Sequence, residues 1–470
     1  MDDKKAKYLL VFITVLILVI NSVLSAETNE TLLCSNNENQ TGACECENHS
    51  SSPWGIRTVD IDCQSRKFTI TTFNWEVLPA LSETLDISWN LFEYVPDLDS
   101  NTLKRLTASH NNVTALDDNN FNKLPQLRDL DLSWNSIEVI SVNAFIGLSH
   151  LQKLDISHNH LRKISFHVFS YLVALDEINL SWNQNLNDTF GLQDVDLFLG
   201  LGATPRLKTI RMNRCGLTSL DLSHGTNLTS IYLEWNNFTS IPTLPRGVTY
   251  LDMSGNPIEV IGTKFFPQMY QLETLMMEDM PQLREIGPYA LYGLPALKKV
   301  SFQNSRSLKK INPEAFGPIQ TGNETEQLAL EELILRGAAL ETLNSSLSSV
   351  FRNLKTIDLA GLPLDCDCRV VWIKHLDIET GAQCHEPKIL HGSKVSEMNF
   401  HEAECKSWPG WIQHTMHGLM LIVFLVVCSV GFYMLVVRLR PFHRSSMRKV
   451  GPSSPYAPIT IEPNRAENHF

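Results

Sequence analysis

Two stretches of this chain repeat one pattern: Leu127-Arg-Asp-Leu130-Asp-Leu132-Ser-Trp-Asn135-Ser-Ile137 and, twenty-four residues later, Leu151-Gln-Lys-Leu154-Asp-Ile156-Ser-His-Asn159-His-Leu161. Apolar residues stand at positions one, four, six and eleven of the phrase, and Asn stands at position nine. Positions four and six alternate with polar residues, which predicts a short strand that turns two apolar side chains to one side. The Asn follows at a turn, where its amide can pair with backbone groups that would otherwise be buried without partners.

Twelve copies of this phrase lie between Ser82 and Leu364, mostly twenty to twenty-five residues apart, a period typical of leucine-rich repeats. They begin at Ser82, Leu103, Leu127, Leu151, Leu175, Leu207, Leu228, Val248, Leu272, Leu297, Leu330 and Leu354. One repeat cannot bury its apolar side alone, so neighbours are expected to stack. The predicted fold is an α/β repeat solenoid, a horseshoe with a parallel sheet on its concave face.

Some repeats depart from Asn at position nine. Cys215 stands there in one repeat, and we interpret it as a buried structural thiol, with metal binding or reactivity as alternatives. Four later repeats replace the Asn by Met280, Ser305, Ala338 and Leu362. We therefore expect the row of stacked Asn side chains, the asparagine ladder, to be weaker in the C-terminal half.

Two apolar segments indicate membrane targeting. Residues 1–26 have the charged, apolar and small-residue order of a signal peptide, with a retained anchor as the alternative. Residues 418–437 carry no formal charge and are long enough to cross a bilayer as a helix. Tryptophans precede this segment and Arg and Lys follow it, which predicts a single-pass type I protein of the plasma membrane. The net charge of −12 gives no electrostatic footprint for nucleic acid.

Ten Asn-x-Ser/Thr sequons all precede the predicted membrane span, in agreement with this topology. Nine are candidate glycosylation sites: Asn29, Asn39, Asn48, Asn112, Asn187, Asn227, Asn237, Asn323 and Asn344. Asn179 is set apart, because it lies within a strand phrase and a glycan there would project from the sheet.

Eight of the ten cysteines form two sets that bracket the repeats: Cys34, Cys44, Cys46 and Cys63, and Cys366, Cys368, Cys384 and Cys405. An oxidising compartment favours disulfides, and a zinc site would more often show Cys-x-x-Cys pairs. We interpret the sets as stapled caps that cover the open ends of the solenoid. Each set of four allows three pairings.

These cysteine sets, the repeat phrase and Leu364-Asp-Cys366-Asp-Cys368-Arg-Val-Val-Trp372 resemble the extracellular leucine-rich-repeat receptors and adhesion proteins of animals. The resemblance covers residues 34–405, and Trp372 and Leu376 match the short helix of that family's C-terminal cap. It implies four disulfides: Cys34 to Cys46, Cys44 to Cys63, Cys366 to Cys384 and Cys368 to Cys405. The expected organisation is a signal peptide (1–26), an N-terminal cap (27–80), about twelve repeats (81–364), a C-terminal cap (365–405), a stalk (406–417), a transmembrane helix (418–437) and a cytoplasmic tail (438–470).

Function must come from exposed positions, because this fold serves many unrelated tasks. Position five is acidic in the N-terminal half, which indicates either a docking stripe for a basic protein or ordinary repeat filler. Near the centre of the sheet, Arg211, Tyr232 and Met276 depart from that filler and form one candidate protein-binding patch. A second candidate is the row of Trp89, Trp134, Trp182 and Trp235, with His110 and His158 among them. These rings form either a binding edge or a stack that covers the sheet margin.

No catalytic, metal or nucleotide motif stands out, so we expect neither an enzyme nor a cofactor. The tail is too short and polar to fold alone, and Tyr456-Ala-Pro-Ile459 resembles the Tyr-x-x-apolar sorting signal that cytoplasmic adaptors bind. We therefore predict a cell-surface adhesion molecule or co-receptor with a homophilic or heterophilic protein partner. The alternatives are a shed, sequestering protein and an innate-immune pattern receptor that needs a signalling partner.

Overall fold

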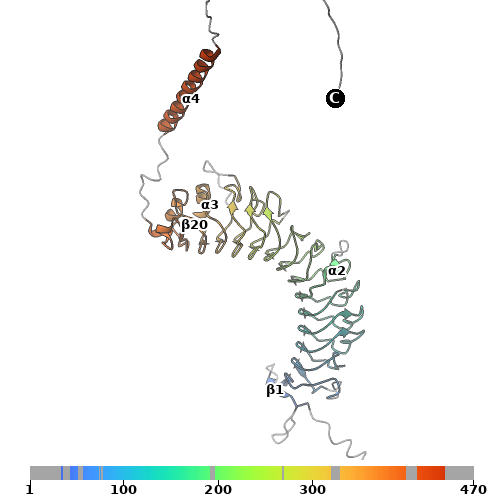
Figure 1. Ribbon diagram of the computed structural model, residues 1–470. Coiled ribbons are helices and arrows are strands. Elements are labelled where there is room, and N and C mark those ends of the chain that lie inside the picture. The colour runs from blue at the N-terminus through green and yellow to red at the C-terminus, as the bar shows by residue number, and fades with distance from the viewer. Residues whose placement is uncertain are drawn as a thin grey trace, which may run out of the picture. The chain divides into compact units, whose positions relative to one another are not determined.

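The computed structural model describes residues 33–34, 43–50, 57–72, 75, 78–162, 164–190, 196–266, 269–318, 329–398 and 410–439. The chain divides into two units, Met1–Phe400 and His401–Phe470, and each is described by itself. Figure 1 shows the first unit as a curved stack of similar turns.

Each of the twelve phrases forms one short strand. The strands are β3 (Ser82–Asp86), β4 (Arg105–Thr107), β6 (Asp129–Asp131), β8 (Lys153–Asp155), β9 (Glu177–Asn179), β10 (Thr209–Arg211), β11 (Ser230–Tyr232), β12 (Tyr250–Asp252), β14 (Thr274–Met276), β16 (Lys299–Ser301), β18 (Glu332–Ile334) and β19 (Thr356–Asp358). They pair in parallel in chain order. Two cap strands, β1 (Glu45–Ser50) and β2 (Arg57–Asp62), extend the sheet to fourteen strands within the described residues, with β1 antiparallel to β2. The predicted repeat solenoid with a parallel sheet is confirmed.

The strand register aligns equal positions of neighbouring phrases. Leu130 pairs with Leu154, for example, and Asp131 pairs with Asp155. Each phrase position therefore forms a row that crosses the sheet from turn to turn. This alignment brings together the side chains that the candidate sites need.

Turns and very short elements build the side opposite the sheet. They include β5 (Ala115–Leu116) paired with β7 (Val139–Ile140), and β13 (Val260–Ile261), β15 (Glu285–Ile286) and β17 (Lys310–Ile311) in a second small sheet. The helical part of the repeats is limited, in the described residues, to α2 (Asn187–Phe190), η1 (Ser345–Leu347) and α3 (Ser348–Phe351).

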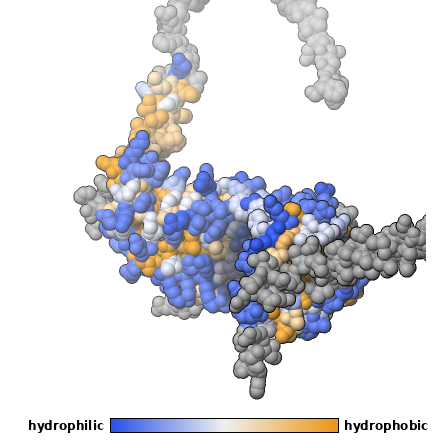
Figure 2. Space-filling view, turned by 90° about the horizontal axis from the view of Figure 1, so that it is seen from below, coloured by the Kyte–Doolittle hydropathy of each residue, from blue (hydrophilic) through white to orange (hydrophobic). Residues whose placement is uncertain are grey.

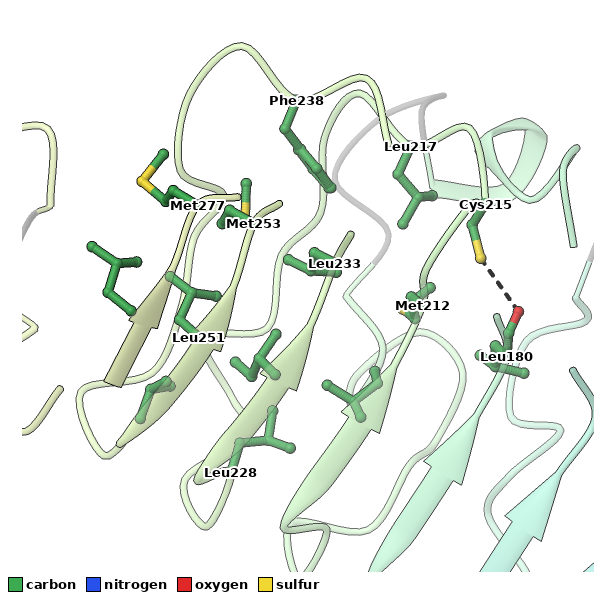
Figure 3. Packing of buried hydrophobic residues seen from close by; sticks show 14 of the residues in the cluster. Leu180, Met212, Cys215, Leu217, Leu228, Leu233, Phe238, Leu251, Met253 and Met277 are labelled. Atoms are coloured by element: carbon green, nitrogen blue, oxygen red, sulfur yellow. Dashed lines mark hydrogen bonds between the residues drawn. The ribbon is translucent and has the colours of Figure 1, made fainter. Parts of the chain in front are cut away.

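The core is one continuous row of apolar layers between the sheet and the opposite side. Figure 3 shows the side chains of Met212, Leu233 and Leu251, from three successive repeats, directed into this layer. Leu251 lies on β12, and Met212 and Leu233 directly follow β10 and β11. These side chains are completely buried. Burial of each such side chain contributes about 1.5–3 kcal/mol, so the stack of turns is held mainly by this layer.

The asparagine ladder lies directly after the strands. Asn159 is buried and donates to the carbonyl oxygens of Leu132, Ile156 and Ser157 at 3.0, 3.1 and 3.0 Å. Its own oxygen accepts from the backbone N–H of Ile137 at 2.9 Å. Met280, Ala338 and Leu362 are buried in the equivalent places and have no side-chain amide to contribute, so the ladder is weaker in the C-terminal half, as predicted.

Cys215 continues the ladder with a thiol. Its Sγ lies 3.3 Å from the carbonyl oxygen of Leu180, a contact drawn in Figure 3. The side chain is completely buried, and this burial raises the pKa of the thiol to about 12. A thiol that stays protonated at neutral pH fits a structural role rather than a reactive one.

Disulfides staple both ends of the repeat unit. Cys34 bonds to Cys46 and Cys44 bonds to Cys63 at the N-terminal end. Cys366 bonds to Cys384 at the other end, between β20 (Leu364–Asp365) and β21 (Cys384–Glu386). These are pairs that the family resemblance implied. Cys368 is also disulfide-bonded, and its expected partner Cys405 lies outside the described residues.

Three short helices complete the C-terminal cap: η2 (Val371–His375), η3 (Lys388–Leu390) and η4 (Val395–Glu397). Trp372 on η2 packs edge-on against Phe351 with ring centroids 5.4 Å apart. Its indole N–H donates to the carbonyl oxygen of Leu343 at 3.1 Å, which ties the cap to the last turns of the solenoid.

The second unit contains α4 (Gly410–Leu439), a helix of 30 residues. Its segment Gly418–Leu435 is the one described segment that is long and apolar enough to cross a membrane. Figure 2 shows apolar residues over much of the helix surface, whereas the visible surface of the repeat unit is mainly hydrophilic. The helix begins at Gly410, so part of the segment that we expected to be a stalk is helical.

Candidate protein-binding surfaces

The acidic residues at position five accept hydrogen bonds in the turns that follow their strands. Asp86, Asp131 and Asp155 each accept a hydrogen bond, at 2.8 Å, from the backbone N–H two residues further on. Burial raises the pKa of Asp131, and the carboxylates of Asp155 and Asp86 raise it further. These contacts favour the structural interpretation of the acidic row over a docking stripe.

The structure brings Arg211 and Tyr232 together near the centre of the sheet. The Arg211 guanidinium lies 4.0 Å from the centroid of the Tyr232 ring, and its Nε donates to Glu177 at 3.1 Å. The Tyr232 ring in turn lies 4.9 Å from that of Tyr250. Met276 is two strands away from Tyr232, beyond Asp252. The cation of this patch is thus already paired with an acid of the same face.

Carboxylates that we did not single out from the sequence flank this patch. Burial raises the pKa of Glu234 and of Asp252, and Glu278 raises both further. Glu234 and Glu278 stand at position seven of their phrases, where most of the N-terminal repeats have Ser. The centre of the sheet is therefore more acidic and less hydrated than position five alone indicates.

The row at position eight forms one continuous stack, which we call the aromatic ribbon. Ring centroids of successive members lie 3.8, 5.1, 3.8 and 4.8 Å apart, and their planes differ by no more than 19°. An arginine guanidinium then lies 4.5 Å from the last of these rings and 4.7 Å from the next indole. The ribbon consists of Trp89, His110, Trp134, His158, Trp182, Arg214 and Trp235.

The rings of the ribbon stack, and they also remain exposed. The four tryptophans expose 56, 51, 38 and 44 % of their surface in chain order. The ribbon is thus both stacked and exposed, so stacking does not remove these rings from contact with a partner. Exposed tryptophan is the residue type most enriched among the dominant contacts of protein interfaces.

Every ribbon residue has a left-handed backbone. The φ angles run from +53° at His110 to +63° at Trp182. Side chains other than Gly, Asn and Asp visit this region at a cost of about 1–2 kcal/mol each. Stacking of one aromatic pair returns about 0.5–1.5 kcal/mol, so the rings give no clear gain in stability over the small residues that this conformation favours.

An open groove of about 550 Å³ runs along the ribbon. Trp134, His158 and Trp182 form one side of it. Residues just after the ladder form the other, including Ser136, Glu138, His160, Arg162 and Gln184. The groove therefore joins aromatic edges to polar and basic side chains, a combination suited to a polypeptide ligand.

The described sequons fall on several surfaces. Asn112 and Asn237 are exposed at position ten, beside the ribbon, and Asn48, Asn227 and Asn344 are exposed elsewhere. Asn187 is half-buried, with its side-chain oxygen 3.1 Å from the backbone nitrogen of Thr218. The amide of Asn179 donates to Asp155 at 2.8 Å, so it is engaged within the sheet. Asn29, Asn39 and Asn323 lie outside the described residues, as do Tyr456 and Ile459 of the candidate sorting motif.

Comparisons with known proteins agree with this architecture. A leucine-rich-repeat family matches residues 101–161 and 135–184, and a BspA-type leucine-rich-repeat region matches residues 246–332. Tsukushi of Gallus gallus is 27 % identical over 135 residues, which are 28 % of this chain and 34 % of Tsukushi. Vasorin of Mus musculus is 27 % identical over 203 residues, 40 % of this chain and 27 % of Vasorin. The match thus spans about a third or less of either relative.

A solved octameric complex of Latrophilin 3, Unc5D and FLRT2 contains a chain with a similar fold. The TM-score is 0.51 at 17 % identity, over 78 % of this chain and 99 % of that one. Together with the twelve parallel strands and the disulfide-stapled ends, these findings show a leucine-rich-repeat fold that is similar to extracellular leucine-rich-repeat proteins.

Proposed function

We propose that this protein is a single-pass cell-surface protein that binds another protein through its repeat domain, as an adhesion molecule or a co-receptor. The observation that carries the proposal is the aromatic ribbon. Four exposed tryptophans stand in a row on strained backbone, where Gly or Asn would be less costly. Tryptophans at positions where the backbone conformation favours Gly or Asn are better explained by binding than by folding.

The placement at the cell surface rests on the second unit and on the sequons. Helix α4 supplies an apolar segment of spanning length, and basic residues follow it in the sequence. All ten sequons precede it. In this topology the repeats face outward and the tail, with Tyr456 and Ile459, faces cytoplasmic adaptors.

The experiment displays the full chain on cells and measures self-aggregation and capture of a library of cell-surface ectodomains. The ribbon variant carries Trp134→Gly and Trp182→Gly, because Gly tolerates the left-handed backbone and creates no sequon. The matched variant carries Arg211→Asp and Tyr232→Asp on the sheet. Surface staining reports folding and transport of each variant.

We expect the ribbon variant to lose partner binding by about tenfold or more, as truncation of central interface tryptophans does, at unchanged surface staining. The sheet variant should retain binding. The opposite pattern would move the site to Arg211 and Tyr232. Wild-type cells that neither aggregate nor capture any ectodomain would contradict the proposed function.

A further inference from the structure

We propose that the groove along the aromatic ribbon binds an extended, acidic segment of the partner protein, and that glycans at Asn112 and Asn237 confine this segment to the turns between them. The inference rests on the proposed function, since it names the class of partner for that surface. It adds a chemical preference and a boundary, each of which can fail while the proposed function stands.

The stacked arrangement determines which part of each ring a ligand can touch. Because the faces of neighbouring rings cover one another, the surface presents ring edges and indole N–H groups. Ring edges carry the positive end of the aromatic quadrupole, and an indole N–H is only a donor. Within the described part of the chain, the indole N–H groups of Trp89, Trp134, Trp182 and Trp235 lie on exposed side chains and donate to no protein acceptor. The ribbon therefore offers donors and positive edges to carboxylate and carbonyl oxygens.

The charged side chains beside the ribbon also favour a ligand with negative charge. Arg214 lies between two indoles, and no described carboxylate lies within ion-pair distance of it. Cations of the sheet behave differently: Arg105 pairs with Asp129, and Lys299 pairs with Glu332. The groove is lined by one acid, Glu138, and one arginine, Arg162, and burial lowers the pKa of His158, which keeps that ring uncharged at neutral pH. With Arg214 the strip carries two arginines and one acid, so a protein of net charge −12 has a donor-rich, net basic strip at this margin of the sheet.

The dimensions of the ribbon fit an extended segment. Its seven members follow consecutive turns, and adjacent strands lie about 4.8 Å apart, so the ribbon is about 29 Å long. An extended chain rises about 3.3 Å per residue, so about nine residues would span the whole ribbon, and about five of them would lie along the roughly 14 Å between Trp134 and Arg214.

Two sequons mark the ends of the accessible part. Asn112 and Asn237 stand at position ten of the His110 and Trp235 turns, and both side chains are exposed. The turns of Trp134, His158, Trp182 and Arg214 lie between them and carry no sequon at that position. An N-linked glycan is bulky and solvated, so glycans at the two flanking sites would leave these four turns open.

The chemical preference is tested by selecting random peptides of about nine residues against the full chain on cells. Cells that carry the Trp134→Gly and Trp182→Gly variant serve for counter-selection. We expect the selected peptides to be rich in Asp and Glu and to bind less tightly as salt is raised. Arg214→Gln should weaken them about tenfold, whereas Arg214→Lys, which keeps the charge, should retain most of the affinity.

Neutral or basic ribbon-dependent peptides would overturn the acidic class and leave the proposed function standing. Equal binding by the Gln and Lys variants would overturn the role of the Arg214 charge and with it the acidic preference. Failure to recover any ribbon-dependent peptide would overturn the extended segment as the ligand.

The boundary is tested by adding a glycan inside the open turns. Ser136→Asn together with Glu138→Thr creates a sequon at position ten, with the same spacing that Asn112 and Asn237 have naturally. The matched control, Ala339→Asn with Glu341→Thr, places a sequon at position ten of a C-terminal turn. Glu138→Thr alone controls for the lost carboxylate. A mobility shift reports occupancy of each new site.

We expect the first glycan to abolish capture of the selected peptides and the control glycan to leave it unchanged. Glu138→Thr alone should preserve or strengthen binding, since it removes the one acid of the groove. Capture that survives an occupied glycan at Ser136→Asn would overturn the placement of the segment. Mass spectrometry showing Asn112 or Asn237 unmodified on the cell-surface protein would overturn the boundary.

Discussion

The first seven turns and the last five adopt one backbone with different residues. At position eight the first seven have the ribbon side chains, whereas the last five have Gly255, Asp279, Asn304, Gly337 and Gly361. All twelve have positive φ, from +51° to +72°. The C-terminal turns therefore use residues that this conformation favours. The backbone does not require rings in the N-terminal turns, so the difference between the two regions points to the surface that the rings create.

The residue type of the ladder changes close to the boundary between these two regions. Asn236 and Asn256 are the last two of its asparagines, and Met280, Ser305, Ala338 and Leu362 follow. The N-terminal turns combine costly backbone at position eight with strong hydrogen bonding at position nine. We infer that the ladder stabilises the turns that carry the exposed ribbon.

The largest expected effect compares ladder residues of the two regions. Asn159→Ala removes four hydrogen bonds at a buried site and should lower the free energy of unfolding by about 3 kcal/mol. Ser305→Ala removes two weak contacts, a donation to the carbonyl oxygen of Met277 and an acceptance from the backbone N–H of Met280, both at 3.3 Å, and should cost about 1.5 kcal/mol. Chemical denaturation of the detergent-solubilised full chain, followed by tryptophan fluorescence, measures both. Equal losses would show that the ladder does not stabilise the two regions differently.

An intermediate effect is expected at the end of the ribbon. A Cβ on Gly255 would lie 2.5 Å from Cδ2 of Trp235, whereas one on Gly361 would meet nothing closer than backbone at 3.6 Å. Both glycines have φ near +70°. Gly361→Ala should therefore cost about 1 kcal/mol for the backbone alone. Gly255→Ala should cost about 2 kcal/mol, because the Trp235 ring must also move.

Thermal unfolding gives the two stabilities, and near-ultraviolet circular dichroism reports the Trp235 environment. Only the Gly255 variant should change the aromatic spectrum. A matching spectral change in the Gly361 variant would mean that the spectrum does not report the end of the ribbon.

The sequence was sufficient to predict the strands, because position four of every phrase is an apolar residue that is buried in the structure, from Leu85 to Ile357. It was also sufficient to place the four tryptophans in one row. It also placed His110 and His158 among them, but it did not reveal that Arg214 continues the row or that the rings stack face to face, because stacking depends on register and ring orientation. At position eight, Gly255, Gly337 and Gly361 indicated a left-handed backbone, whereas the bulky residues of the N-terminal turns gave no such indication. The acids Glu234 and Glu278 stand at position seven, so the pattern of position five did not predict them.

The smallest effect concerns Asp252, which lies in the sheet where the two regions meet. Burial raises the pKa of its carboxyl, and Glu278 raises it further. The folded state therefore holds the proton to a higher pH than the unfolded state does, so this group lowers stability as pH rises through that interval. The destabilisation by the Asp252 carboxylate is complete above the pKa of the folded state and absent below the pKa of the unfolded state. Asp252→Ser keeps a side-chain oxygen that can accept from the backbone N–H of Ser254, as Ser301 accepts from Gln303, and loses the charge without creating a sequon. It should stabilise the protein by about 0.5 kcal/mol at neutral pH and not at all in acid. Denaturation at both pH values tests this, and a gain of the same size in acid would show that the charge of Asp252 is not the cause.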